Sequence, residues 1–115
     1  MKFAPGAAGV TTNATNAVLS GPLDKPAPYV LRVRLGPGGQ VSPHTHPDTR
    51  YVTVLSGEYS AGKGDTVSPA NETELPVGSY MVIPAGVPHY SIARKGEAVY
   101  QEYGVGPTAT NFIKK

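Results

Sequence analysis

The chain has 115 residues, no cysteine and a formal net charge of +2. A chain of this length forms one compact domain, and the absence of cysteine excludes disulfides and thiolate metal sites. The sequence contains neither the basic stripe of a nucleic-acid-binding protein nor the roughly 20 consecutive apolar residues of a membrane span, so we expect no nucleic-acid or membrane partner.

Residues 1–28 are small and polar, and proline interrupts them repeatedly. Such a composition predicts an irregular N-terminal arm that ends in an edge strand. The arm lacks the uninterrupted apolar run of a signal peptide, so we expect a cytoplasmic protein. The remaining residues, 29–115, are expected to form a single barrel.

Fourteen glycines and twelve prolines disfavour long helices, and alternating residues predict strands instead. Residues 29–35 alternate apolar with polar side chains, which is the period of a half-buried strand. The Gly-Pro-Gly-Gly sequence at 36–39 predicts a turn. Two further strands are expected over residues 40–46 and 51–55.

The second half of the chain continues the same pattern. Residues 58–68 are typical of a hairpin and residues 69–76 of a polar loop. We expect a strand over residues 80–84, two strands within 89–105, and at most a terminal turn over 109–115. Eight or so short strands without a helix indicate an all-β barrel or sandwich.

The three histidines carry the clearest chemical signal. His44 and His46 are two residues apart on a predicted strand, so both side chains point to one face, and Pro43 and Pro47 restrict the backbone beside them. A neutral imidazole offers one lone pair to a metal while its other nitrogen is anchored by a hydrogen bond. The remaining histidine, His89, is the candidate third ligand of a metal site.

Two motifs resemble those of the cupin family. The first is Gly38-x5-His44-x-His46-x3-Arg50-x6-Gly57, and the second is Gly78-x5-Pro84-x-Gly86-x2-His89. The resemblance implies a double-stranded β-helix, which is a small jelly-roll barrel, with the three histidines binding one divalent metal ion at its mouth. Because such barrels often pair through edge strands, the resemblance also implies a homodimer.

Two positions depart from the family pattern. Arg50 stands where the family has a glutamate ligand, and Ala93 stands where an asparagine closes the second motif. Arginine stays protonated and offers no lone pair, so the fourth ligand is missing or has moved. By strand alternation Gln40 is the best replacement, and the alternatives are Asp48, Gln101, Glu102 and water.

A divalent ion held by three neutral histidines keeps its charge and its open coordination positions, so it favours an anionic small molecule. The guanidinium of Arg50 suits a carboxylate or phosphate if it points into the barrel, and Tyr51 is a second candidate contact. If Arg50 instead faces solvent, we expect it to pair with Asp48. Iron, manganese, nickel and zinc all suit a histidine site.

The resemblance extends to reaction type. Three-histidine members of the family include iron(II) dioxygenases, which implies a metalloenzyme of oxygenase type. A non-catalytic sensor or storage protein is the alternative, because one fold hosts many functions. No catalytic residue is assigned, and the candidate proton carriers are Asp48, Tyr51, Tyr90, Glu102 and Tyr103.

Overall fold

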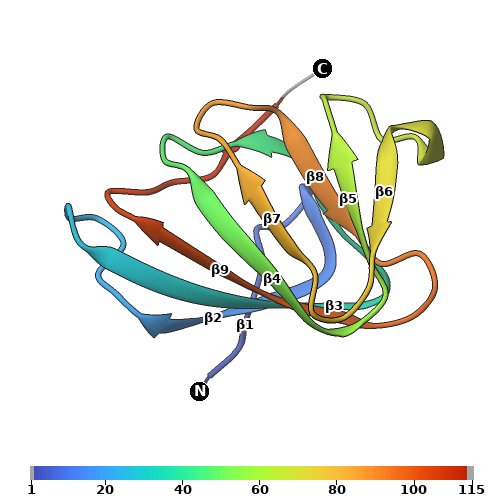
Figure 1. Ribbon diagram of the computed structural model, residues 1–115, viewed down its shortest axis with the longest axis horizontal. Coiled ribbons are helices and arrows are strands. Elements are labelled where there is room, and N and C mark those ends of the chain that lie inside the picture. Colours follow the sequence, from blue (N-terminus) through green and yellow to red (C-terminus); the bar gives the residue numbers. More distant parts are fainter. Residues whose placement is uncertain (1, 114–115) are drawn as a thin grey trace.

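The computed structural model describes residues 2–113, which form a curled antiparallel sheet with one short 3-10 turn (Figure 1). The elements are β1 (Ala4–Pro5), β2 (Thr11–Ser20), β3 (Pro28–Thr45), β4 (Arg50–Gly57), β5 (Tyr59–Lys63), η1 (Pro69–Asn71), β6 (Glu72–Leu75), β7 (Tyr80–Ile83), β8 (His89–Ile92), β9 (Ala98–Val105) and β10 (Asn111–Phe112). The strand order is β6-β5-β8-β3-β9-β4-β7, and β2 and β10 also pair with β3. The sheet forms the predicted jelly-roll double-stranded β-helix.

Strand β3 links the two halves of the barrel. Its first part pairs with β9 as far as Leu35 and Ala98, and its second part pairs with β8 from Gln40 and Ile92 onward. The Gly-Pro-Gly-Gly sequence lies between these parts and bends β3 without reversing it, so the predicted turn at residues 36–39 is wrong. Glycine permits this change of partner because Gly38 adopts a φ of 74°.

The alternation of β3 produces the inner wall of the barrel. Leu31, Val33 and Leu35 are buried, as the period of two predicts. The core cluster draws on most strands of the barrel and consists of Ala14, Val33, Leu35, Val52, Val54, Tyr59, Ile83, Ala93, Ala98 and Tyr100. Ala93, the position that departs from the family pattern, is therefore a core residue.

Three local predictions differ from the structure. Residues 58–68 do not form a hairpin, because β5 pairs with β6 and β8. The polar segment 69–76 contains η1 and β6, an edge strand whose partly exposed residues hide the strand pattern. In place of a terminal turn, Asn111–Phe112 forms β10 on β3, and residues 114–115 lie outside the described residues.

The N-terminal arm pairs with the barrel of its own chain. Strand β2 runs along β3 from Thr11, opposite Val41, to Ser20, opposite Val30, with two register shifts. The short strand β1 pairs in turn with β2. The arm therefore extends the sheet beside β3, and several of its residues line the cavity described below.

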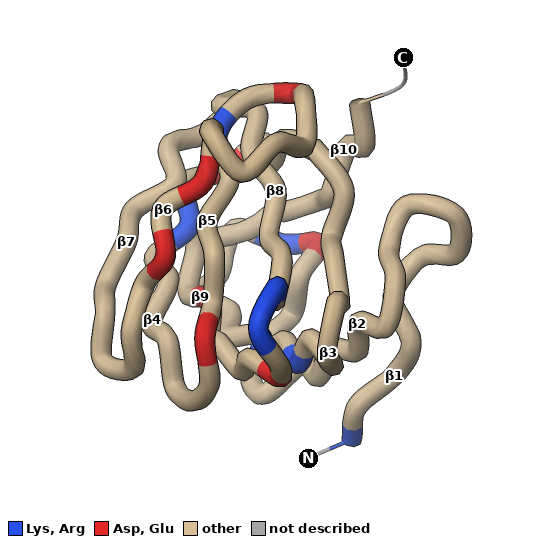
Figure 2. Tube along the Cα trace, turned by 90° about the vertical axis from the view of Figure 1, so that its right-hand side faces the viewer, with Lys and Arg blue, Asp and Glu red and all other residues tan. Residues whose placement is uncertain are grey.

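Charged residues of both signs are scattered over the strands and loops (Figure 2). On β6 and the loop between β8 and β9, Arg94 pairs with Glu72 at 2.5 Å and Lys95 with Glu74 at 3.1 Å. No helix among the described residues has the length and apolar content needed to cross a lipid bilayer.

Gly57 closes β4 at a point where no side chain fits. It has a φ of 79°, and a Cβ atom there would lie 1.8 Å from the carbonyl oxygen of Glu97. We expect Gly57→Ala to lower the free energy of unfolding by about 3 kcal/mol, from backbone strain and overpacking together. Urea denaturation at pH 7 measures this change.

Gly78→Ala is the matched control. Gly78 has a φ of 89° but no neighbouring atom within 4 Å of the added Cβ. This substitution should cost only the strain of the left-handed backbone, about 1 kcal/mol. Equal losses in the two variants would contradict the steric argument at Gly57.

Candidate metal centre

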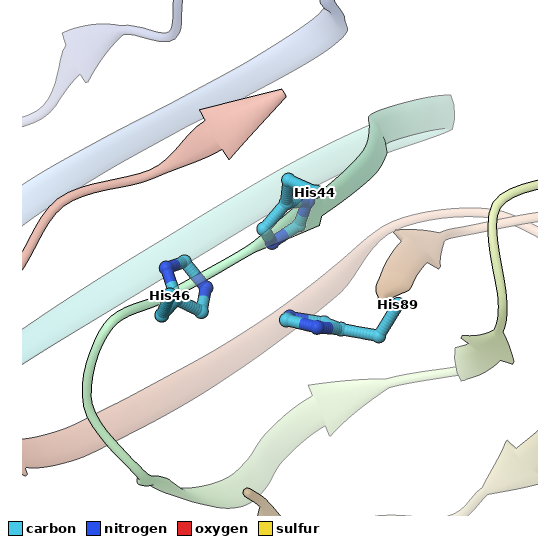
Figure 3. A group of neighbouring side chains, drawn as sticks. All are labelled: His44, His46 and His89. Carbon is cyan, nitrogen blue, oxygen red and sulfur yellow. The ribbon is translucent and has the colours of Figure 1, made fainter. Parts of the chain in front are cut away.

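The three histidines converge from two adjacent strands (Figure 3). His44 lies near the end of β3, His46 follows that strand, and His89 begins β8 directly opposite His44. The ring centroids of His44 are 4.7 Å from those of His46 and 4.2 Å from those of His89. One nitrogen from each ring lies within 4.8 Å of the others, so the group is compact enough to hold one metal ion.

Backbone carbonyls orient all three rings. The Nδ1 atom of His44 lies 2.6 Å from the carbonyl oxygen of Ser42, and that of His89 lies 2.9 Å from the carbonyl oxygen of Val87. The Nδ1 atom of His46 lies 2.8 Å from the carbonyl oxygen of Ala109. A carbonyl only accepts hydrogen bonds, so each Nδ1 is the donor and each Nε2 keeps its lone pair.

The free nitrogens have the chemistry of metal ligands. Nε2 of His46 is buried and has no hydrogen-bond partner among the described residues. An unpartnered polar atom in the interior is costly, and coordination to a cation would satisfy it. The anchored Nδ1 with a free Nε2 is the usual arrangement of a metal-binding histidine, so the residues present fit a metal ion.

Burial keeps the imidazoles neutral. Desolvation lowers the pKa of His44 to about 3, helped by the nearby His89, and lowers the pKa of His46 to about 3, helped by Arg50. The pKa of His89 is lowered for the same principal reason. Neutral rings carry the lone pairs that a metal needs, and the site therefore stays available to a cation well below neutral pH.

These pKa values predict acid sensitivity of the metal-free protein. An unfolded histidine titrates near 6.5, whereas folded His44 and His46 titrate near 3. Below pH 6.5 the unfolded chain therefore binds more protons, so stability falls as the pH falls. Each of the two histidines should remove about 2 kcal/mol between pH 7 and pH 5, measured by urea unfolding after chelation.

One further buried group, Glu102, also changes its protonation in this measurement. Burial raises the pKa of the Glu102 carboxyl, so its protonation as the pH falls opposes part of the loss. The control is the double variant His44→Gln/His46→Gln, which should lose less stability between pH 7 and pH 5. An unchanged pH dependence in that variant would contradict the assignment to these two histidines.

Arg50 points into the barrel and not into solvent. Its side chain is 5% exposed and its Nη1 donates to Oε1 of Glu102 at 3.1 Å, while Nη2 donates to Oγ1 of Thr108 at 2.9 Å. No salt bridge among the described residues joins Asp48 to Arg50; Asp48 instead accepts hydrogen bonds from Tyr29 and Thr108. The Nε atom of Arg50 is buried without a partner among the described residues.

Gln40 does not share the face of the histidines. The β3–β8 ladder carries a bulge between Val41 and His44, and the extra residue reverses the alternation. Val41, which pairs with Ser91, therefore lies on the side of His44, and the side chain of Gln40 donates to Oγ of Ser42 at 3.2 Å. Gln40 therefore does not lie where strand alternation predicts it, because the bulge interrupts the alternation.

Tyr51 also lies apart from the histidines. Successive residues of a strand point to opposite faces, so with Arg50 inside, Tyr51 lies on the outer face and is 38% exposed. Its ring centroid is 6.0 Å from that of Tyr103. Tyr51 therefore does not line the cavity that contains Arg50.

A cavity of about 320 Å³ joins the histidines to the arginine. Its polar wall contains His44, His46, Arg50 and Glu102. The rest is largely apolar and comes from β2, β3, β9 and the C-terminal segment, including Leu31, Val33, Tyr100 and Phe112. A small molecule inside it would lie beside His44, His46 and Arg50.

Two features of the site were not predicted from the sequence. Glu102 was a candidate ligand or proton carrier, but its ion pair with Arg50 was not foreseen, although its alternation with Tyr100 on β9 indicates an inward position. The contacts of Thr108 and Ala109 with Arg50 and His46 have no signal in the sequence.

Comparisons with known proteins agree with this architecture. The cupin domain family model matches residues 31–100, and no curated protein matches the sequence significantly. Similar solved structures include the polyketide cyclase RemF from Streptomyces resistomycificus, with 17% identity, a TM-score of 0.83 and coverage of 99% of this chain and 80% of that chain. A cupin-like protein from Thermotoga maritima has 20% identity, a TM-score of 0.75 and coverage of 96% and 86%.

An oxalate oxidase in complex with the substrate analogue glycolate is also similar. It has 24% identity and a TM-score of 0.69, with coverage of 88% of this chain and 55% of that chain. Identities this low establish a shared fold and leave the activity open. The family model, by contrast, covers more than half of the chain, and the protein belongs to the cupin family.

Proposed function

We propose that this cupin binds one divalent metal ion through His44, His46 and His89 and receives a small acidic molecule at the remaining coordination positions. The observation that carries the proposal is the set of three imidazoles whose Nδ1 atoms are anchored to backbone carbonyls. The free Nε2 atoms are left to face a common point.

The donor set supports an open site. Among the described histidine and acidic residues, only these three form a group that is close enough to share an ion. A bound ion would supply positive charge and free coordination positions for an acidic ligand. Iron, manganese, nickel and zinc each suit such a site.

Arg50 supports an acceptor group in the same cavity. Its buried Nε–H has no partner, so a carboxylate oxygen that reaches it would satisfy a donor that is otherwise unpaired. The carboxylate of Glu102 already balances the positive charge of Arg50. We therefore expect Arg50 to hold the ligand through a directed hydrogen bond more than through net electrostatic attraction. The similar oxalate oxidase, which holds glycolate, supports a small acid as the ligand class.

We further propose a metalloenzyme of oxygenase type, with non-catalytic metal or ligand binding as the alternative. The cavity beside His44 and His46 favours the first, because it leaves room for a reactant next to the ion. The geometry favours Glu102 as a proton carrier, because it lines the cavity. It disfavours Tyr51 and Tyr103, which lie together on the outer face of the sheet. The homodimer stays a prediction.

The test uses protein loaded with manganese. Relaxation of solvent water protons measures the water bound to the ion, and titration with glycolate or oxalate should reduce this relaxation as the acid displaces water. Neutral ethylene glycol should have no effect at equal concentration. Oxygen consumption by the iron-loaded protein with the same acids then separates enzyme from binder, and failure of the acids to displace water would overturn the acidic ligand.

A further inference from the structure

A second cavity adjoins the histidine group at His89. It has a volume of about 720 Å³ and is lined by β6 and β7, which stand at the two ends of the strand order β6-β5-β8-β3-β9-β4-β7. Its lining includes His89 and none of the residues that line the cavity of His44 and His46. The histidine group therefore borders two cavities, and we call the second one the seam cleft.

Most of the seam cleft is apolar. Leu75 of β6 faces Met81 and Ile83 of β7 across it, and Val87 lies beside His89. Val82 and Val87 are 45% and 43% exposed. A volume and a composition of this kind are typical of sites for small apolar molecules.

The polar end of the seam cleft is positive. Lys63 pairs directly with His89 in the β5–β8 ladder, so the two side chains lie on the same face of the sheet. Among the residues described as lining the cleft, Lys63 is the only lysine, and there is no arginine, aspartate or glutamate. Lys63 belongs to none of the salt bridges among the described residues. Among the described residues no salt bridge therefore balances Lys63, whereas Arg50 is paired with Glu102.

We propose that the seam cleft binds a carboxylic acid with an apolar body. The carboxylate lies at Lys63 and His89, and the apolar body lies over Leu75, Met81 and Val87. The contact with a metal ion at His89 rests on the proposed function, whereas the contact with Lys63 does not. An amphipathic acid would thus approach the histidines from the seam cleft, in addition to the small acid that the inner cavity receives.

Charge and size distinguish this site from the inner cavity. A compact acid such as oxalate fits the inner cavity of about 320 Å³, whose arginine already has a carboxylate partner. A longer acid gains from burial of its chain in the larger cleft and from the unpaired ammonium of Lys63. The two cavities thus select acids by their apolar length.

Three probes separate these contributions in calorimetric titrations of the zinc-loaded and metal-free protein. Octanoate carries both features, acetate carries the charge alone, and octanol carries the chain alone. We expect octanoate to bind on the order of a hundredfold more tightly than acetate. Equal affinities for octanoate and acetate would overturn the proposal, as would octanol binding as tightly as octanoate.

Variants locate the bound molecule. Lys63→Gln should weaken octanoate about fivefold and leave octanol unchanged, and Val87→Asp should weaken both. The control is Lys25→Gln, which removes an exposed lysine from the N-terminal arm and should change neither. Octanoate affinity that is insensitive to both Lys63→Gln and Val87→Asp would place it elsewhere and overturn the proposal.

A manganese-loaded sample tests the orientation. The carboxyl carbon of labelled octanoate should relax faster than its terminal methyl carbon, because the acid end lies nearer His89. Uniform relaxation along the chain would contradict this orientation. Failure of the proposed function is seen separately, as absence of bound metal, and octanoate binding to the metal-free protein that still depends on Lys63 would then support the cleft by itself.

Discussion

Protein reconstituted with zinc and freed of excess ions is expected to retain close to one ion per chain, and the His44→Ala/His89→Ala variant almost none. The two rings lie on paired strands with centroids 4.2 Å apart, so the double substitution removes adjacent ligands. One remaining histidine is a weak site for a divalent ion. Elemental analysis by mass spectrometry gives the ratio directly.

Gln40→Ala is the matched control for this loss. Gln40 lies on the same strand as His44, but its side chain donates to Ser42 and lies on the other face beyond the bulge. We expect this variant to keep its full metal content. Loss of the ion from Gln40→Ala would instead restore Gln40 as the fourth ligand, and retention of the ion by the double histidine variant would contradict the three-histidine site.

The Arg50→Leu variant is expected to lose about 3–5 kcal/mol of stability at pH 7, because it leaves Glu102 buried without its counter-charge. The guanidinium and the carboxylate are 5% and 8% exposed and 3.1 Å apart. Burial already raises the pKa of Glu102 against the opposing effect of Arg50. Urea unfolding of the variant and the parent protein measures the difference.

The pH dependence of this variant has a definite sign. Without Arg50 the pKa of Glu102 should rise further, so the folded state holds a proton that the unfolded chain has lost. The loss of stability should therefore be larger at pH 8 than at pH 5. The control, Arg50→Leu/Glu102→Leu, removes both charges and should recover most of the loss, while equal destabilisation of the single and double variants would contradict the ion-pair argument.

Local patterns in the sequence predicted the barrel and the histidine group well. The period of two over residues 29–35 identified the inner wall, because alternate burial depends only on the pleat of a strand. His44 and His46 are spaced so that this geometry brings them together. His89 was predicted as the third member of the group from its family motif alone, because strand periodicity does not relate residues on β3 to residues on β8.

The failures arise where strand geometry is interrupted or contacts are distant. The bulge after Val41 reversed the parity on which Gln40 depended. Pro43 lies within the bulge, but a proline in a strand is compatible with an edge position as well as with a bulge. The pairing of Arg50 with Glu102 joins residues from β4 and β9, so it required the tertiary fold. Glycines at residues 36–39 permit a bend as readily as a reversal, which explains the turn that was wrongly predicted.

The carbonyl of Ala109 that anchors His46 makes the site dependent on a segment synthesised long after that ring. A chain emerging from the ribosome exposes His44 and His46 first, and the strand that carries His89 follows. The ring of His46 gains its anchor only when the residues after β9 have docked against β3. A metal site with all three rings anchored would therefore be complete only after the segment around Ala109 has docked.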